Sequence, residues 1–528
     1  MKKNHFYFLL FFLAFNLLFS QRQLAWSDTV NSAGNFSEYF GGTDGNMIEL
    51  DAHKNVYSAI MSDSLGLKRV LISKHDSMGN DLWTTIFHSS PGANDWLSAI
   101  ALDDSGNVLI GGAAGISIGQ SKLMVVKFNC STGQLIWSYF SSSVYYAFAA
   151  NDIKFDEFGN IYACANYANP STNSYWYSVL KFNSNGNLLN SFSFNGNTGN
   201  YGYPNHMAVD TLGNVYVTAQ YKNFISNSDD GALIKLDQNL NQIWIQTYDG
   251  PQGGNDYFYD LELDKNQCPI IAGCERQGPI GSTVLTIKYS PTGNIIFSDN
   301  FSVPNAIRGT GRSITSDVFG NVYTAAETDS SGLFGFSILK YDTAGNLKNH
   351  AKITPPTCLY SAAIDIVVGP KQQAIMFGHF SDGSISSGVI IELDSSGVLK
   401  WLHQTSGYET AYNSGVVDDD NNLYVCGSIK TGSANDLLVQ KFEPLITLGL
   451  SSVSTAGELS VFPNPVSGFV KVKSSDTIHK IIIYDATMKV VFERDFGNEK
   501  NIDLDMHQLP CGFYFLKVNG HMEKIIKN

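Results

Sequence analysis

Most of the chain consists of short strand-like stretches separated by tight turns. One turn recurs throughout and has the form Asp-x-x-Gly-Asn, followed by apolar and aromatic residues that alternate, as in residues 210–217. This alternation is typical of half-buried β-strands. The Asp side chain can accept hydrogen bonds from backbone N–H groups two residues on, and Gly or Asn takes the left-handed conformation that closes a short hairpin.

The copies of this turn are evenly spaced. Seven of them begin with an aspartate: Asp51, Asp103, Asp156, Asp210, Asp264, Asp317 and Asp418. A decayed copy begins at Gly369, so the successive gaps are 52, 53, 54, 54, 53, 52 and 49 residues. A fixed period of this length in an all-β chain predicts the blades of a β-propeller.

A second repeated feature lies about 23 to 25 residues after the first. It is an apolar pair followed by lysine at Lys74, Lys127, Lys181, Lys235, Lys288 and Lys340, with Glu392 at this position in the seventh unit and Gln440 before Lys441 in the eighth. A further turn and a strand that often carries Trp come next, so each unit holds four strands. We therefore predict an eight-bladed propeller over residues 21–444, with seven blades as the alternative because the seventh unit is the weakest.

The two ends of this region predict how the ring closes. The last unit lacks a Trp-bearing fourth strand, whereas Trp26 lies in a strand that precedes the first turn. We expect this N-terminal strand to complete the last blade, which removes the open edges of the sheet.

Residues 1–20 have the pattern of an export signal, with Lys2 and Lys3 ahead of an apolar run from Phe6 to Phe19. Cleavage is expected after Ser20, and an uncleaved anchor is the alternative. No other stretch approaches transmembrane length. The net charge of −14 argues against nucleic acid and against anionic membranes as partners.

The seven cysteines are interpreted mainly as small core residues. Cys268 and Cys274 are the one local pair considered for a disulfide, because export permits such bonds.

A different pattern begins after the propeller. Residues 445–458 are small and polar and are interpreted as a linker. Residues 459–528 alternate between strands and turns, which predicts a small β-sandwich with an immunoglobulin-like arrangement.

This C-terminal unit carries a distinctive set of residues: Pro463, Asn464, Pro465, Tyr484, Asp485, Gly512, Phe513, Tyr514 and a basic tail from Lys524 to Lys527. On these residues it resembles the type A sorting domain of the type IX secretion system of Bacteroidetes. Met488 and Cys511 depart from the family pattern. The resemblance implies transit through the periplasm, recognition by the type IX machinery, removal of the domain, and release of the cargo or its attachment to the cell surface.

The repeats resemble bacterial β-propeller-repeat proteins with Asp-x-x-Gly-Asn-x-Tyr hairpins. This resemblance is specific for fold and does not indicate an activity, because propellers host unrelated functions.

Few motifs point to chemistry. The repeated lysines could attract an acidic ligand in a central channel, but a role in the blade, reaching a nearby carboxylate, is the favoured interpretation. The acidic stretches 229–231 and 418–422 resemble calcium loops without their full ligand spacing, so no cofactor is assigned and calcium is kept as an alternative. No catalytic residue and no metal ligand is assigned.

Two functions remain. The first is a binding module for glycan or protein partners, with exposed aromatic residues between the turns; its candidate residues are Tyr146, Trp176, Tyr201 and Tyr257. The second is a secreted polysaccharide hydrolase or lyase with an active site at the propeller axis. Carboxylates that converge on the axis would favour the enzyme, and an axis lined by Ser, Thr and apolar groups would exclude it.

Overall fold

The computed structural model describes residues 22–30, 38–39, 47–445 and 459–527, apart from short gaps within the last two ranges. These gaps are residues 65–66, 91, 118–119, 144, 170–173, 196–205, 226–227, 278–280, 331, 356–357, 407, 432–433, 463–465, 467, 486–488, 511 and 519–520. The expected export signal and most of the linker lie outside the described residues. The chain divides into two compact units, residues 1–444 and 445–528.

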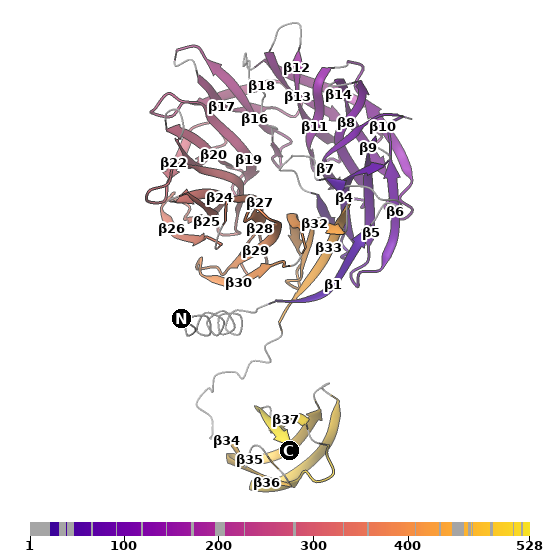
Figure 1. Cartoon of the computed structure of the whole chain (residues 1–528), viewed down its shortest axis with the longest axis vertical. Coiled ribbons are helices and arrows are strands. Elements are labelled where there is room, and N and C mark those ends of the chain that lie inside the picture. Colours follow the sequence, from indigo (N-terminus) through magenta and orange to yellow (C-terminus); the bar gives the residue numbers. More distant parts are fainter. Residues whose placement is uncertain are drawn as a thin grey trace. The chain divides into compact units, whose positions relative to one another are not determined.

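The first unit is an eight-bladed β-propeller, as predicted (Figure 1). Six of its sheets hold one blade each, and an eight-stranded sheet holds the second and third blades, which are joined where β11 pairs with β9. The first strands of the blades are β3 (Ile48–Leu50), β7 (Asp95–Leu102), β11 (Tyr145–Phe155), β15 (Met207–Val209), β19 (Asp256–Leu263), β23 (Gly309–Ser316), β27 (Tyr360–Val368) and β31 (Thr410–Val417). The second strands are β4 (Val56–Ser64), β8 (Val108–Ser117), β12 (Ile161–Asn169), β16 (Val215–Asn223), β20 (Pro269–Gln277), β24 (Val322–Ser330), β28 (Ala374–Ser381) and β32 (Leu423–Thr431).

The outer half of each blade follows in the same order. The third strands are β5 (Leu67–His75), β9 (Gln120–Phe128), β13 (Ser174–Phe182), β17 (Ser228–Leu236), β21 (Gly281–Tyr289), β25 (Leu333–Tyr341), β29 (Ser386–Leu393) and β33 (Ala434–Pro444). The fourth strands are β6 (Asp81–Phe87), β10 (Leu135–Phe140), β14 (Leu188–Asn195), β18 (Gln242–Tyr248), β22 (Ile295–Phe301), β26 (Leu347–Ile353), β30 (Leu399–Gln404) and β1 (Arg22–Val30). A short additional strand, β2 (Glu38–Tyr39), pairs with β4.

The first strands form a closed ring around the axis. Each contacts the first strand of the next blade, and β31 contacts β3. The fourth strands are the most exposed and lie on the rim, as β6, β22, β26 and β30 show in Figure 1. Closure follows the prediction, because β1 pairs with β33 from Arg22–Pro444 to Val30–Leu437.

The two ends of the ring differ. The turns between first and second strands, and between third and fourth strands, lie at one end, which we call the turn face. The loops between second and third strands, and the connections from one blade to the next, lie at the other end, which we call the loop face. Every antiparallel pairing within the blades enforces this separation.

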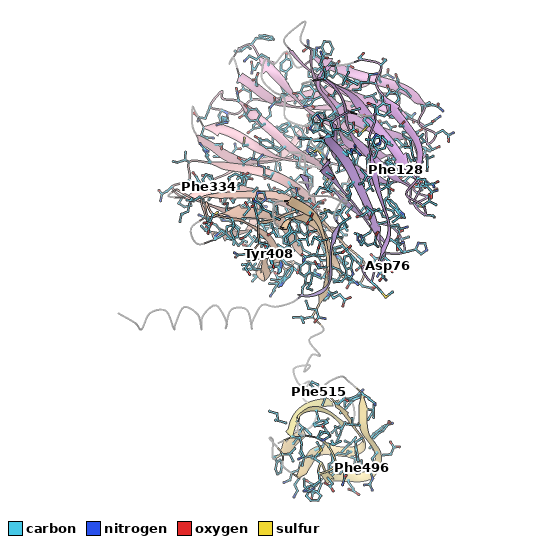
Figure 2. The ribbon with its side chains drawn as sticks, turned by 45° about the vertical axis from the view of Figure 1, so that its right-hand side comes forward. Asp76, Phe128, Phe334, Tyr408, Phe496 and Phe515 are labelled. Carbon is cyan, nitrogen blue, oxygen red and sulfur yellow. The ribbon has the colours of Figure 1, made fainter. Side chains whose placement is uncertain are left out.

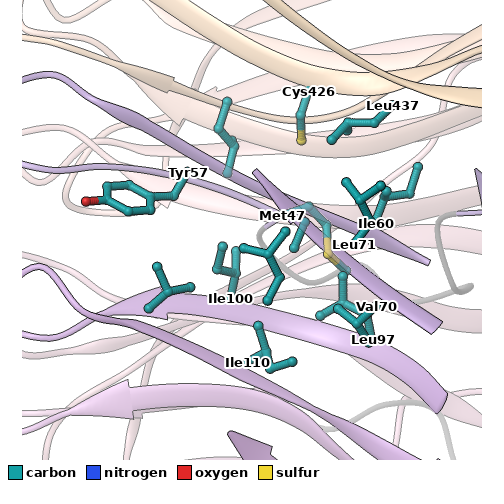
Figure 3. Close-up of a cluster of buried hydrophobic side chains, with 14 of the residues drawn as sticks. Met47, Tyr57, Ile60, Val70, Leu71, Leu97, Ile100, Ile110, Cys426 and Leu437 are labelled. Atoms are coloured by element: carbon teal, nitrogen blue, oxygen red, sulfur yellow. The ribbon is translucent and has the colours of Figure 1, made fainter. Parts of the chain in front are cut away.

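The core lies between blades. Met47, Ile60 and Val70 of the first blade pack with Leu97 of the second and Leu437 of the last (Figure 3). Burial of such apolar surface is the main stabilising contribution. Cys268 and Cys274 both carry free thiols, so the disulfide considered for them is not formed. Six residue steps separate their Cα atoms along the extended chain of β20, about 20 Å, far beyond the reach of a disulfide.

The second unit is a curled five-stranded sheet around its own core, consistent with a small sandwich. Its strands are β34 (Leu459–Phe462), β35 (Phe469–Asp485), β36 (Val490–Asp505), β37 (Gly512–Val518) and β38 (His521–Lys527). The long strand β35 pairs with β34 near its start and with β37 near its end. Val470, Ile481 and Leu516 are among the residues that fill its core. Within the described residues, no helix is long and apolar enough to cross a membrane.

Candidate functional site

Each turn aspartate organises its own hairpin. Asp156 Oδ1 accepts hydrogen bonds from the N–H groups of Phe158 (3.0 Å) and Asn160 (2.9 Å). Its Oδ2 accepts from the Asn160 side-chain amide (2.7 Å) and from the Tyr162 hydroxyl (3.0 Å). Burial raises the pKa of Asp156, but these hydrogen bonds outweigh it and hold the pKa below its ordinary value.

The other turn aspartates use the same donors. N–H groups two and four residues on donate to Asp51, Asp103, Asp210, Asp264 and Asp317, and the N–H of Asn422 donates to Asp418. These seven residues therefore lie on the turn face and shape the hairpins.

The repeated lysines bridge neighbouring blades. A lysine from the third strand and a tryptophan from the fourth strand donate to one backbone carbonyl in the turn between third and fourth strands of the next blade. The sets are Lys74 and Trp83 on Cys130 (3.0 Å each), Lys127 and Trp137 on Ser184 (3.2 Å each), Lys235 and Trp244 on Pro291 (3.1 and 3.3 Å), and Lys441 and Trp26 on Ser77 (3.3 and 3.1 Å). The lysines are thus committed to contacts between blades.

The seventh blade is also bridged to its neighbour, but with an acidic residue at the position of the lysine. It lacks both the turn aspartate and the lysine, and Glu392 replaces the lysine. Arg22 of β1 pairs with Glu392, with 2.6 Å between Nε and Oε2, and also donates to the carbonyl of Asn421. Both side chains are buried, so the strand that closes the ring also supplies the cation that this blade lacks.

Charged side chains gather at the propeller axis, which the repeat pattern had not revealed. They occupy the positions two and four residues before the turns, on the inner ring of first strands. We call this set the axial cluster; its members are Glu49, Asp152, Lys154, His206, Asp260, Glu262 and Asp365. Most are only partly buried, so water reaches them.

Three of the axial carboxylates join neighbouring first strands. Asp260 Oδ2 accepts hydrogen bonds from the Ser313 hydroxyl (2.9 Å) and the Ile314 N–H (2.8 Å). In the same way, Asp365 accepts from the Ser414 hydroxyl (2.9 Å), and Asp152 accepts from the Met207 N–H (3.1 Å). These contacts give the three residues a structural role at the axis.

Lys154, Glu262 and Asp365 give the axis its unusual electrostatics. Lys154 Nζ lies 3.0 Å from Asp152 Oδ1 while 44% of its side chain stays exposed. Burial, with a smaller contribution from the Asp260 charge, raises the pKa of Glu262 to about 8, although a hydrogen bond with Thr315 opposes the shift. Burial also raises the pKa of Asp365 to about 6. At neutral pH the axis can therefore hold a protonated Glu262 near a largely ionised Asp365.

The two acidic stretches considered as calcium loops behave differently. In residues 418–422, Asp418 shapes its turn and lies 3.3 Å from Lys54, which also pairs with Asp420. The stretch at 229–231 lies on the loop face, where Asp230 meets Asp249 and Asp256. Burial raises the pKa of Asp256 to about 7, with repulsion from Glu275 and Asp230 adding to the shift.

The aromatic candidates of the binding hypothesis fall into two groups. Tyr201, and the side chain of Tyr146, lie outside the described residues. Trp176 is partly buried and stacks on Tyr167, with 6.4 Å between ring centroids. Tyr257 is 9% exposed and packs with Tyr259 and Cys274, which leaves little of its ring for a ligand.

Other apolar side chains are exposed together on the loop face. Residues Leu333, Leu359, Tyr360, Ile385 and Tyr408 are between 41% and 61% exposed, and we call them the apolar sector. Leu359 is held beside the loop that carries Ile385, because its N–H donates to the carbonyl of Ser381 (2.9 Å). Tyr408, which is labelled in Figure 2, lies in the connection from the seventh to the eighth blade.

The sorting-signal residues lie in the second unit. Pro463, Asn464 and Pro465 lie outside the described residues, as does the side chain of Lys524. Gly512 begins β37, and the Tyr514 hydroxyl donates to the carbonyl of Pro510 (2.7 Å). Lys527 ends β38, is 9% exposed and forms an isolated parallel bridge with Val466.

Comparison with known proteins identifies this second unit. Residues 460–528 match the family described as the secretion system C-terminal sorting domain. This is a type IX sorting domain, and it indicates export to the cell surface or the extracellular space. The chain is therefore an eight-bladed propeller that carries a type IX sorting domain. No curated protein sequence matches it.

Several solved structures align with this chain at low sequence identity. The quinohemoprotein alcohol dehydrogenase from Comamonas testosteroni is 11% identical, with 86% of this chain and 80% of that chain covered and a TM-score of 0.47. The polysaccharide lyase Uly1 is 9% identical, with 77% and 91% covered and a TM-score of 0.43. A PL25 ulvan lyase is 9% identical, with 79% and 95% covered and a TM-score of 0.44. Similarity at this level carries no argument about activity.

Proposed function

We propose that the protein is a binding module that acts outside the cell and holds a glycan or protein partner on its loop face. The apolar sector carries this proposal. Groups of exposed apolar side chains are typical of interaction sites, and a tyrosine offers a flat ring for stacking together with a polar hydroxyl. Tyr360 and Tyr408 supply such rings near the starts of the first strands of the seventh and eighth blades.

A pair of matched double variants tests this proposal. Leu359→Ser with Tyr408→Ser alters the apolar sector, and Phe158→Ser with Leu212→Ser alters apolar side chains on the turn face that are even more exposed. On an array of polysaccharides and purified glycoproteins, the loop-face variant should lose at least about tenfold in affinity, and the turn-face variant should bind like the parent. Absence of binding by the parent, or an equal loss in both variants, would reject the proposal.

A polysaccharide-cleaving enzyme with its site at the axis is the second candidate. The axial cluster favours it, because glycoside cleavage uses one carboxyl group with a raised pKa and a second that stays ionised. Glu262 fits the acid, and Asp365, with a pKa of about 6, fits the ionised partner. If a polysaccharide panel yields new reducing ends, Glu262→Gln should abolish their release and the loop-face variant Glu409→Gln should not. No release from any polysaccharide would argue against this function.

We also infer the route of export. Residues 1–20 would direct the chain into the periplasm, and the sorting domain would then engage the type IX machinery at the outer membrane. Removal of that domain would leave the propeller either free or attached to the surface. Mass spectrometry of the extracellular protein tests this route, since the mature chain should begin near Gln21 and end within the linker.

A further inference from the structure

Three carboxylates meet on the loop face where the fourth and fifth blades adjoin. Asp230 lies in β17, Asp249 follows β18, and Asp256 begins β19. One oxygen from each lies within 4.8 Å of the others. Figure 1 shows β17 and β19 on these neighbouring blades.

This cluster is largely removed from water, and the described residues give it no cationic partner. Asp230 and Asp256 are 1% and 0% exposed, whereas Asp249 is exposed and leaves access from solvent. Among the described residues, no lysine, arginine or histidine forms an ion pair with any of the three. Buried carboxylates without a compensating charge are strongly unfavourable.

One buried oxygen of Asp230 has no partner of normal hydrogen-bond geometry among the described residues. Asp230 Oδ1 accepts a hydrogen bond from the Ser228 hydroxyl (2.6 Å). Burial raises the pKa of Asp230 overall, although hydrogen bonding with the Asn223 side chain also acts to lower it, and no donor in the described part of the chain reaches Asp230 Oδ2 with normal geometry. A buried polar atom left in this state needs an explanation, and an unrepresented ion is one. This observation is separate from the closeness of the three carboxylates.

The other two ligands are held firmly. Asp256 accepts hydrogen bonds from the N–H groups of Gly250 (2.6 Å) and Arg276 (3.1 Å), which fix its carboxylate while leaving further lone pairs. Asn223 donates to Asp249 Oδ2 (2.8 Å). Their carboxylates therefore need little reorganisation to bind an ion.

We propose that Asp230, Asp249 and Asp256 bind a calcium ion that links the fourth and fifth blades at the loop face. Carboxylate oxygens are the ligands that hard divalent cations prefer. Calcium lies about 2.3 to 2.6 Å from its oxygens, so two ligands on one ion are at most about 5 Å apart, which accommodates the observed spacing. Water would complete the coordination on the exposed side of Asp249.

Calcium titration of the full-length protein, after removal of metal with a chelator, tests this site. Calorimetry should show one calcium ion bound per chain, and thermal unfolding should shift upward because the ion binds the folded state. Asp249→Asn should weaken binding by at least about tenfold. Asp382→Asn, which alters another exposed carboxylate on the loop face, should bind calcium like the parent.

Asp230→Asn separates a metal site from a merely acidic cluster. Removal of one buried charge should raise the thermal stability of the metal-free protein and, at the same time, abolish its response to calcium. Absence of calcium binding at millimolar concentration, or unchanged binding in Asp249→Asn, would overturn the proposal. An equal response to magnesium would overturn the assignment to calcium.

Discussion

At the residue scale, one side chain often performs several structural tasks. The Asp156 carboxylate closes a hairpin through two backbone N–H groups and also receives the buried Tyr162 hydroxyl. Lys181 Nζ lies 3.7 Å from the same carboxylate and donates to the carbonyl of Gln238 in the next blade. The repeated residues are therefore explained by the blade, and the residues that differ between blades are where function should be sought.

The first prediction concerns this turn carboxylate. Asp156→Ala should lower the free energy of unfolding by about 2 to 4 kcal/mol, because it leaves the buried Tyr162 hydroxyl and several backbone N–H groups without an acceptor. Asp76 closes a turn between third and fourth strands through Met78 and Asn80 (Figure 2). Asp76→Ala, which leaves no buried hydroxyl behind, should cost about 1 kcal/mol. Equal losses in chemical denaturation would contradict this account.

The second prediction concerns pH and Glu262. Its pKa rises from 4.5 to about 8 in the folded protein, so the folded state holds more protons than the unfolded state between these values. Stability should therefore be fully present below pH 4.5 and fall as the pH rises toward 8. Each pKa unit corresponds to about 1.4 kcal/mol, but water at the axis screens Glu262, and we expect about 2 kcal/mol in total.

Chemical denaturation at pH 5 and pH 8.5 measures this effect. Glu262→Gln should flatten the decline relative to the parent protein, since glutamine does not titrate. Both proteins retain the other axial carboxylates, so the difference between their pH profiles reports on Glu262. Parallel pH profiles would show that Glu262 ionises normally in the folded state.

At the scale of the elements, the spacing of turns predicted eight blades and the N-terminal Trp-bearing strand predicted their closure, but neither showed what faces the axis. The reason is a register shift in β19 between Phe258 and Asp260. In a regular strand these two side chains would share a face, yet Phe258 lies in the core and Asp260 reaches the next first strand at the axis. Comparable shifts occur in β11, β23 and β27. A strict alternation of polar and apolar residues cannot locate such a shift, so the axial cluster was missed.

The third prediction concerns the strand that closes the ring. Arg22→Ala should destabilise the propeller by about 3 to 5 kcal/mol, because Glu392 would remain buried without its cation. The double variant Arg22→Met with Glu392→Met should recover most of this loss, since it removes both charges. The Lys430–Glu409 pair of the neighbouring blade is nearly half exposed, so Lys430→Ala should cost less than about 1 kcal/mol. Thermal and chemical unfolding of all three variants measure these losses. An equal loss of stability in Arg22→Ala and Lys430→Ala would contradict the prediction.

At the scale of the whole molecule, the sequence divides into a propeller and a sorting domain that directs export. Alternation and turn residues located residues 459–528 as a second β unit, and the family match covers nearly the same range. The loop-face carboxylates, in contrast, could not be grouped from the sequence. Of that cluster only Asp230 stood in a recognisable acidic stretch, because the connection after β18 brings Asp249 and Asp256 to it across 26 residues of chain. Contacts between blades of this kind have no local signal.

The fourth prediction follows from the division into two units. Each has its own hydrophobic core, so deletion of residues 445–528 should leave the unfolding temperature of the propeller unchanged. In a host with a type IX system, the same deletion should retain the propeller inside the cell, because the sorting domain has been lost. Fusion of residues 445–528 to an unrelated folded passenger that carries an export signal should bring that passenger outside. Fractionation with protease treatment of intact cells measures both outcomes, and export of the truncated propeller would show that the address lies elsewhere in the chain.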